Sequence, residues 1–394
     1  MRPPSLLPPT TNSRLNVRLL RPTAWLVVLA VAALSLTGCD LFGTNSDDER
    51  RVTTDVVIAN SGDFNAQDGT LTLYSPTDST ATLEDVNVAF INSLALHNDR
   101  LFVIDNTKAD NAGRITTFDT AELGPIDQIS NPRPPRYMAF PAENKAYVSN
   151  LSRFDDNFNA QPSTVSVIDL EANSVTKRVD VGASPRGIGI VDGKAFVANA
   201  ADGTLSVLDT DSDAATGTLS LNGCARPKSV FVDGEGEVAV VCQGRGEPAA
   251  EVLFLDPDTE EIVERVELGV SVGSVNATQS AYYSAEAEEL YAISGNAAFG
   301  GEGTGEIFRV NTDANALDAT LSVPENDGLV GISAVGYDAV TQDLYVTRPP
   351  VADDGGPLVR ANGTALVLDR DGAVVTRFST GNAPAHIVFL RETQ

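Results

Sequence analysis

Short apolar segments that end in a polar residue alternate along the chain with segments of alternating polarity. The first kind has seven copies, at residues 57–60, 102–106, 147–150, 196–199, 239–243, 290–294 and 344–348. The second kind also has seven copies, at residues 70–74, 115–119, 165–169, 205–209, 252–256, 307–311 and 365–369. Alternating polarity, enrichment in β-branched residues and Asp/Gly turns between the segments are typical of β-strands. The pattern therefore predicts a repeated all-β unit.

Each repeat carries two further strands. An apolar segment precedes each copy of the first kind and often opens with proline, as at Pro135, Pro185 and Pro227. A more polar segment follows each copy of the second kind, as at residues 174–179. Four strands in units of roughly 40–55 residues match the blades of a β-propeller. We therefore predict an all-β fold, a seven-bladed β-propeller of four-stranded antiparallel blades, over residues 52–394.

The two ends of the repeat region complement each other. Residues 54–60 form the second strand of a blade that has no opening strand before it. Residues 384–390 form an opening strand that no further blade follows. We therefore predict that the C-terminal strand is the innermost strand of blade one, which closes the ring and removes both open sheet edges.

The first 38 residues are predicted to be a lipoprotein signal peptide rather than part of the fold. Arg14, Arg18 and Arg21 precede an apolar segment at residues 24–34. Such a segment has about half of the roughly 20 residues that a spanning helix requires. The Leu-Thr-Gly-Cys tetrapeptide that ends at Cys39 resembles the lipobox of bacterial lipoproteins, which implies cleavage before Cys39 and attachment of acyl chains such as palmitate. An ordinary signal-anchor with a chance cysteine is the alternative.

Residues 39–51 are acidic and lack hydrophobic periodicity, so we expect a disordered tether. Asp40, directly after the cysteine, resembles an inner-membrane retention signal, whereas the acidic residues 47–49 resemble a surface-export signal. The two point in opposite directions, and the choice of leaflet stays open. We expect a lipid anchor in a membrane of the cell envelope, at the outer membrane or cell surface rather than the inner membrane.

The chain is strongly acidic, with 27 Lys+Arg against 54 Asp+Glu and a formal net charge of −27. Such a surface repels nucleic acid and anionic lipid headgroups, so we expect no nucleic-acid partner. The excess of carboxylates resembles that of halophilic proteins, in which salt screens the repulsion. A solvated acidic surface explains the charge better than an acid-specific role.

Two repeats resemble a known family. The motifs YVSN (residues 147–150), TVSVID (164–169) and VGASPRGI (181–188) look like the YVTN-type (YncE-like) propeller repeat of bacterial and archaeal surface and periplasmic proteins. The match is close for blades three and four and loose for blades six and seven, where insertions at 296–306 and 348–363 interrupt the pattern. The resemblance implies a propeller and says little about a ligand, because one fold hosts many functions.

Basic residues gather at one end of the predicted channel. In a propeller, the loops that enter the first strand and leave the second lie on one face, around the channel. The candidate cations on this face, which we call the mouth, are Arg136, Arg186, Lys228, Arg348 and His386. Converging cations would suit a carboxylate, phosphate or sulfate. The alternative is that each arginine pairs with an aspartate of a neighbouring blade.

Amides and aromatics are also expected at the mouth. Asn150 and Asn199 belong to a set of strand-end amides (with Asn60, Asn106 and Gln243) that could bind a ligand or hold local turns. The tetrapeptide Phe-Asn-Ala-Gln occurs twice, with Phe64 and Phe158 at its start, and Phe154 and Phe299 add aromatics. An aromatic beside amides suits a sugar ring or a peptide. A loop packed on its own Phe is the alternative.

Cys224 and Cys242 are the two cysteines left after Cys39, and we predict a disulfide between them. Residues 233–236 should form a hairpin turn. Pairing Val232 with Glu237 places Pro227 opposite Cys242, and Cys224 lies three residues upstream of Pro227. A Cα separation beyond about 7 Å would exclude this bond.

The sequence offers little support for catalysis. It has no Gly-x-Ser-x-Gly elbow, and of its two histidines, His97 and His386, only His386 is expected at the mouth. The one tryptophan, Trp25, precedes the mature chain, which argues against tryptophan-rich quinoprotein propellers. Residues 209–213 resemble part of a Ca²⁺ loop but lack its later Gly and Glu, so we expect a solvated turn. We expect no metal and no cofactor.

We therefore expect a lipid-anchored envelope propeller, a monomer, that binds or scaffolds a glycan, peptide or protein at the mouth. A metal-dependent hydrolase, lactonase or lyase would instead need acids that converge on the channel. A structural surface-layer component would need no pocket. The position of three cations discriminates between these roles: Arg136, Arg186 and Lys228. If they face the channel, they favour an anionic ligand, and if they pair with Asp between blades, they favour a purely structural role.

Overall fold

The computed structural model describes residues 51–107, 112–131, 133–244, 248–273, 279–294, 305–324, 329, 331–350 and 361–393. These residues contain twenty-eight strands, arranged in seven four-stranded antiparallel sheets. The strands belong to a compact unit that spans Glu49–Gln394. None of the described residues forms a helix long and apolar enough to cross a membrane.

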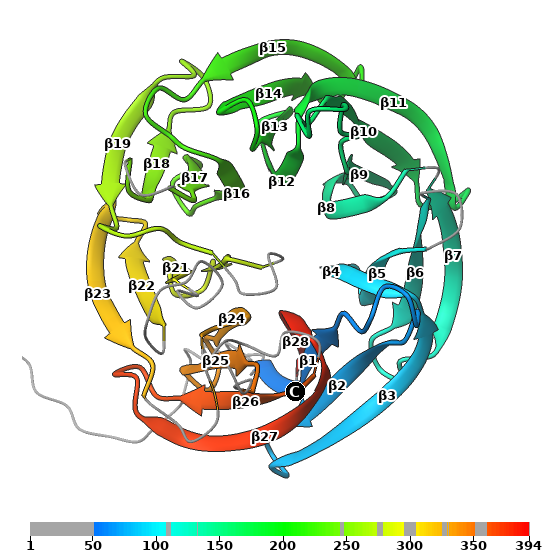
Figure 1. Ribbon diagram of the computed structural model, residues 1–394, viewed down its shortest axis with the longest axis vertical. Coiled ribbons are helices and arrows are strands. Elements are labelled where there is room, and N and C mark those ends of the chain that lie inside the picture. The colour runs from blue at the N-terminus through cyan, green and yellow to red at the C-terminus, as the bar shows by residue number, and fades with distance from the viewer. Residues whose placement is uncertain are drawn as a thin grey trace, which may run out of the picture. The chain divides into compact units, whose positions relative to one another are not determined.

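The sheets are seven propeller blades around a central channel (Figure 1). From the channel outward, blade one has β28 (Pro384–Thr393), β1 (Arg51–Asn60), β2 (Gly69–Ser75) and β3 (Thr80–Val88). Blade two has β4 (Phe90–His97), β5 (Arg100–Asn106), β6 (Gly113–Asp119) and β7 (Pro125–Asn131). Blade three has β8 (Pro135–Ala142), β9 (Lys145–Asn150), β10 (Pro162–Asp169) and β11 (Ser174–Ala183). Blade four has β12 (Pro185–Val191), β13 (Lys194–Asn199), β14 (Thr204–Asp209) and β15 (Ala214–Ser220).

The remaining blades follow the same order. Blade five has β16 (Pro227–Val232), β17 (Val238–Cys242), β18 (Glu251–Leu255) and β19 (Ile262–Glu267). Blade six has β20 (Ala281–Ser284), β21 (Glu289–Ser294), β22 (Glu306–Asn311) and β23 (Ala316–Ser322). Blade seven has β24 (Ala334–Asp338), β25 (Asp343–Arg348), β26 (Asn362–Leu368) and β27 (Val374–Asn382). The seven-bladed fold predicted from the repeats is confirmed.

The hydrophobic core lies between neighbouring blades. The two middle strands of a blade are largely buried on both faces, so polar residues of the alternating segments, such as Ser166 and Ser206, are buried as well. In one core cluster, Val252 and Phe254 of β18 pack with Leu290 of β21 and Phe308 of β22. The outermost strands carry the exposed polar residues, as in β3, where most positions are exposed. Each blade therefore depends on its neighbours to cover its apolar faces.

Strand β28 closes the ring. It pairs antiparallel with β1 from Arg51↔Thr393 to Asn60↔Pro384, which joins the two ends of the described chain in one sheet. Ile387 and Ile58 face each other in this pairing, and both are fully buried. The closure predicted from the missing opening strand and the surplus final strand is confirmed.

A β-bulge marks the mouth end of several innermost strands. The register shifts between Pro135 and Met138 in β8, between Pro185 and Ile188 in β12, and between Pro227 and Ser229 in β16. Each bulge places an extra residue on the inner strand directly after its proline, which changes the direction of the side chain there. These residues are the three basic ones expected at the mouth.

Candidate binding site at the channel mouth

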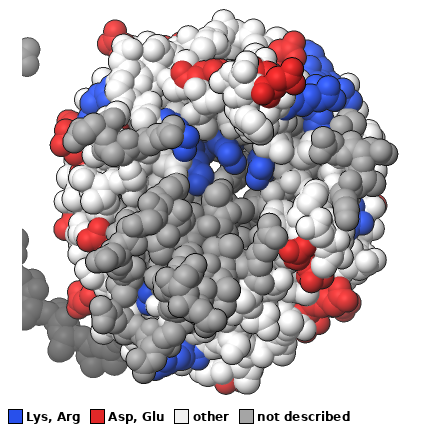
Figure 2. Space-filling model, in the orientation of Figure 1, with Lys and Arg blue, Asp and Glu red and all other residues white. Residues whose placement is uncertain are grey.

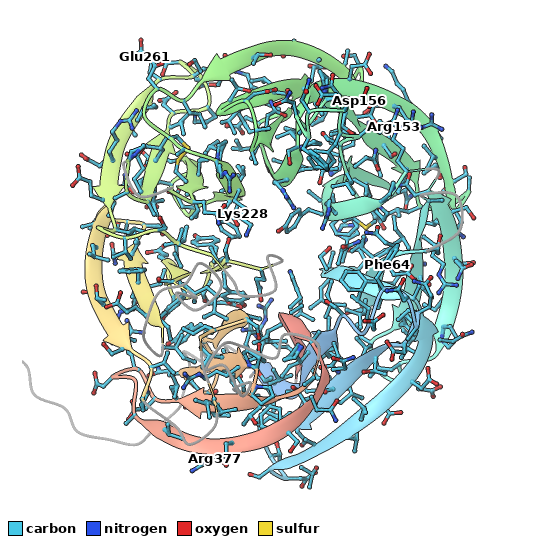
Figure 3. All side chains as sticks on the ribbon, viewed as in Figure 1. Phe64, Arg153, Asp156, Lys228, Glu261 and Arg377 are labelled. Atoms are coloured by element: carbon cyan, nitrogen blue, oxygen red, sulfur yellow. A yellow bond between two sulfur atoms is a disulfide. The ribbon has the colours of Figure 1, made fainter. Side chains whose placement is uncertain are left out.

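Three cations on adjacent blades converge on the channel. Arg136 on β8, Arg186 on β12 and Lys228 on β16 each follow the proline that opens the innermost strand. Figure 2 shows Lys and Arg side chains gathered around the central opening, and Figure 3 shows Lys228 beside the channel. In the part of the chain that the structure describes, none of the three forms an ion pair with a carboxylate, and Arg136 Nη1 donates to Asn92 Oδ1 at 3.3 Å. The interblade Arg–Asp pairing that would indicate a purely architectural role is therefore not observed for them.

Burial, and after it the neighbouring positive charges, lower the pKa of two of these groups. Burial, and then the charges of Arg186, Arg136 and Arg226, lower the pKa of Lys228 to about 7. Burial and the charge of Arg186 lower the pKa of Arg136 to about 10, so Arg136 stays protonated. Its Nε is buried without a hydrogen-bond partner among the described residues. An anion that entered the mouth would relieve this repulsion and supply the missing acceptors.

A hollow of about 960 Å³ opens beside the cations. Arg186, Arg226 and Lys228 line it together with the aromatic side chains of Phe154 and Phe158. Phe158 is 87% exposed and Phe154 is 57% exposed, so both rings present open faces to solvent. The hollow thus combines positive charge with exposed aromatic surface, a pairing that suits an acidic sugar.

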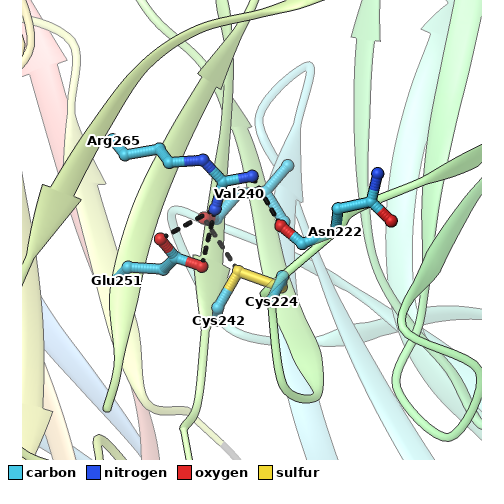
Figure 4. Close-up of a disulfide and its surroundings, with 6 residues drawn as sticks. All are labelled: Asn222, Cys224, Val240, Cys242, Glu251 and Arg265. Carbon is cyan, nitrogen blue, oxygen red and sulfur yellow. Dashed lines mark hydrogen bonds and ion pairs between the residues drawn. A yellow bond between two sulfur atoms is a disulfide. The ribbon is translucent and has the colours of Figure 1, made fainter. Parts of the chain in front are cut away.

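A disulfide between Cys224 and Cys242 holds the rim of this hollow (Figure 4). The Cα atoms lie 5.3 Å apart, within the range that such a bond requires. Pro227 lies opposite Cys242, as expected. The rest of the register differs from the prediction, because Val232 pairs with Val238 instead of Glu237. The bulge after Pro227 accommodates the one-residue difference. The disulfide fixes the segment that carries Arg226 and leads into Lys228.

The two Phe-Asn-Ala-Gln loops differ in structure although their sequences match. Phe64 packs edge-on against Phe90, with ring centroids 5.9 Å apart, so it is the packed loop residue of the alternative interpretation. Phe158 has a left-handed backbone (φ 61°) and projects from a turn in which Asp155 Oδ1 accepts from the amides of Asn157 and Asn159. Only the loop of blade three presents its phenylalanine to the hollow, and Phe64 is not among the residues that line it.

Asn150 and Asn199 act within the blades rather than at the mouth. Both are fully buried. Asn150 Nδ2 donates to Thr164 Oγ1 and Ser166 Oγ at 3.0 Å, and Asn199 Nδ2 donates to Thr204 Oγ1 at 3.0 Å. Their assignment as ligand-binding candidates is corrected, because these bonds tie the end of the second strand to the third and leave no atom exposed.

Arg348 and His386 also differ from the expected free cations. Arg348 is fully buried, and its guanidinium donates to the carbonyls of Gly331, Pro324 and Leu329 at 2.9, 2.9 and 3.3 Å. It therefore holds loops of blade seven. Burial lowers the pKa of His386 to about 4, so the ring is neutral near pH 7 and adds no positive charge.

Other predicted features fall elsewhere. Cys39 and Phe299 lie outside the described residues. His97 lies on the opposite face, where its ring stacks on Phe140 at 4.2 Å. Asp213 pairs with Lys145 at 3.0 Å instead of serving a cation loop. No group of three or more His, Cys, Asp or Glu side chains suited to a metal ion is found among the described residues.

Sequence reasoning missed Arg226. It immediately precedes Pro227 and has a left-handed backbone (φ 58°), as does Ser184 before Pro185 (φ 57°). The repeated residue–Pro–basic pattern at the strand openings could have drawn attention to it. Asn92, which accepts from Arg136, was also missed, because nothing in its local sequence links blade two to blade three.

Comparisons with known proteins show the fold. No protein-family model matches the chain, and no curated protein matches its sequence. A periplasmic gluconolactonase of Pseudomonas aeruginosa is similar in structure, with a TM-score of 0.59, 13% identity and coverage of 85% of this chain and 99% of that chain. A quinonprotein alcohol dehydrogenase-like protein of Bacteroides thetaiotaomicron is similar with a TM-score of 0.60 and 14% identity. The match covers 84% of this chain and 78% of that chain. A protein from Lactobacillus plantarum is similar with a TM-score of 0.58 and 17% identity, and the match covers 86% of this chain and 100% of that chain. At these identities the likeness supports a β-propeller and carries no activity across.

Proposed function

We propose that this propeller is a binding module of the cell envelope that takes an acidic saccharide at the channel mouth. The observation that carries the proposal is the convergence of Arg136, Arg186 and Lys228 on the channel without a carboxylate partner among the described residues. In a chain of net charge −27, unpaired cations at one place repel each other and gain from a bound anion.

Phe154 and Phe158 favour a sugar as the carrier of that anion. Both rings are exposed at the rim of the same hollow, where a sugar ring could stack while its carboxylate or sulfate reaches Arg186. A peptide with an acidic side chain is the competing ligand. Exposed aromatic faces without a deep apolar pocket fit the flat face of a sugar better than an apolar side chain.

Anchoring through Cys39 and membership of the YVTN-type family are part of the proposal. Strand β1 runs from Arg51 to Asn60, and Asn60 ends at the mouth, so the chain enters the ring on the opposite face. A tether that joins Cys39 to Arg51 would therefore attach at the face opposite the mouth.

Calorimetric titration of the full chain, purified in mild detergent, tests this function. The probe is oligogalacturonate, and neutral cello-oligosaccharide of the same length is its control. We expect binding of the acidic probe that weakens as salt rises, because salt screens the attraction between the probe's carboxylates and the cations of the mouth. Arg186→Gln should weaken it at least tenfold.

Arg51→Gln is the matched control, because Arg51 is an exposed arginine that pairs with Glu286 and does not line the hollow. It removes the same charge and should leave binding unchanged. Equal loss in the two variants would mean that only net charge matters. No binding of either sugar at low or high salt would overturn the proposal and favour a structural role.

A further inference from the structure

Lys228 differs from the other described lysines. Lys145 and Lys194 each donate to a carboxylate, at 3.0 and 3.1 Å, and Lys177 donates to a backbone carbonyl at 3.0 Å. Lys228 has no such acceptor among the described residues, although the residue is buried, with 5% of its surface exposed. It lines the hollow at the mouth. An amine in this position is held in place by packing and is not occupied by a structural bond.

The surroundings of Lys228 favour the neutral amine. The charged groups that act on it are Arg186 of β12, Arg136 of β8 and Arg226 of the preceding loop, and all three are positive. Burial and this repulsion lower its pKa from 10.5 to about 7, which favours the unprotonated amine far more than in an exposed lysine. A neutral, desolvated lysine next to cations is the arrangement that makes an amine nucleophilic.

We propose that Lys228 captures the carbonyl group of a 2-oxo acid as an imine while Arg186 binds the adjacent carboxylate. The inference rests on the anion site proposed above and adds a covalent step to it. In a 2-oxo acid the carboxylate and the reactive carbonyl are neighbouring carbons. Arg186 and Lys228 line the same hollow and lie near enough for the charge of Arg186 to act on the amine, so they are the pair that would engage these two groups.

The step needs no oxidant or reductant. The neutral amine of Lys228 attacks the carbonyl carbon, a C–N bond forms, and the carbonyl oxygen takes a proton to give a carbinolamine. The nitrogen then loses its remaining proton, the hydroxyl leaves as water, and a C=N bond forms. Amine and 2-oxo acid thus give imine and one water, and hydrolysis reverses the reaction.

Reductive trapping tests the proposal. The full chain is incubated with pyruvate and cyanoborohydride at pH 7.5, and intact mass and peptide mapping locate the adduct. The chain has five lysines, so assignment to one site is direct. We expect the adduct at Lys228 to form at least tenfold faster than any adduct at Lys194, because the Lys194 amine already donates to Glu260 Oε1 and to the carbonyl of Pro257.

Three controls complete the test. Lys228→Arg, whose guanidinium cannot form this imine, should lose the adduct, and Lys194→Arg should leave both the adduct at Lys228 and the binding of oligogalacturonate unchanged. Dihydroxyacetone, which has a carbonyl and no carboxylate, should label Lys228 at least tenfold more slowly than pyruvate.

The outcomes separate the two proposals. Adducts spread over all lysines, or none at Lys228 in a protein that binds oligogalacturonate, would overturn the imine and leave the anion site intact. Labelling of Lys228 that is equal for both carbonyls and unaffected by Arg186→Gln would overturn the carboxylate anchor and leave the nucleophile intact.

Discussion

Reduction of the Cys224–Cys242 disulfide should destabilise the ring and loosen the mouth. The bond closes a loop across 18 residues between the rim segment and β17. In the chain-entropy model, a loop of this length restricts the unfolded state enough to contribute about 3 kcal/mol to the free energy of unfolding. The loop is also held by two backbone bonds, from Gln243 N to Arg226 O and from Gly244 N to Ala225 O, each 3.1 Å long.

These backbone bonds predict that the reduced protein still folds. We expect its free energy of unfolding to fall by about 3 kcal/mol. Affinity for oligogalacturonate should also fall, because Arg226 and Lys228 follow Cys224 along the freed segment. Denaturant titrations of the oxidised and reduced chain, followed by far-UV circular dichroism, measure the change. Tryptophan fluorescence is unsuitable because Trp25 is the only tryptophan and precedes the ring.

A double variant, Cys224→Ala with Cys242→Ala, separates the bond from the reagent. It should unfold near the reduced wild type and should not respond to reductant. If the oxidised and reduced wild type unfold at the same denaturant concentration, the disulfide adds nothing to the backbone bonds at the rim, and the reasoning from loop closure is refuted.

Three further predictions concern single side chains. Phe158→Ala should change the free energy of unfolding by less than about 0.5 kcal/mol and should weaken saccharide binding. Phe64→Ala should lower the free energy of unfolding by about 1–2 kcal/mol, because it loses the Phe90 contact, and should leave binding intact. Denaturation and calorimetric titration of both variants check this, and equal effects would contradict the assignment of Phe158 to the hollow and of Phe64 to the packed loop. Asn150→Ala should lower the free energy of unfolding by about 3 kcal/mol, because it removes a side chain with several buried hydrogen bonds; a loss below about 1 kcal/mol would show that these bonds are readily replaced. His386 has a pKa of about 4 in the folded chain against 6.5 ordinarily, so the unfolded chain takes up the proton first and stability should fall as pH drops from 6.5 to 4. His386→Asn should remove that part of the acid dependence, and a variant with an unchanged stability–pH curve would refute it.

Most of the fold follows from the local pattern of the sequence. Strand identity was predictable because the two middle strands of each blade recur seven times, one as a short apolar segment and the other as a segment of alternating polarity. Ring closure was predictable because an incomplete blade at one end and a spare strand at the other complete each other, as β1 and β28 do. The partners Cys224 and Cys242 were predictable because they lie at the ends of one short hairpin, where few alternatives exist.

The site depended on contacts between blades, which no local pattern encodes. Phe64 and Phe158 begin the same tetrapeptide, yet Phe64 packs edge-on against Phe90 of the next blade and is 37% exposed, while Phe158 is 87% exposed. Arg186 and Arg348 are both arginines expected at the mouth, but loop carbonyls of blade seven surround Arg348. The sequence by itself determined which segments are strands and how the ring closes, since the repeated polarity pattern and the incomplete blades at its two ends are local features of the chain. Only the tertiary structure decided which cations face the channel, because that depends on how side chains from separate blades share one small space.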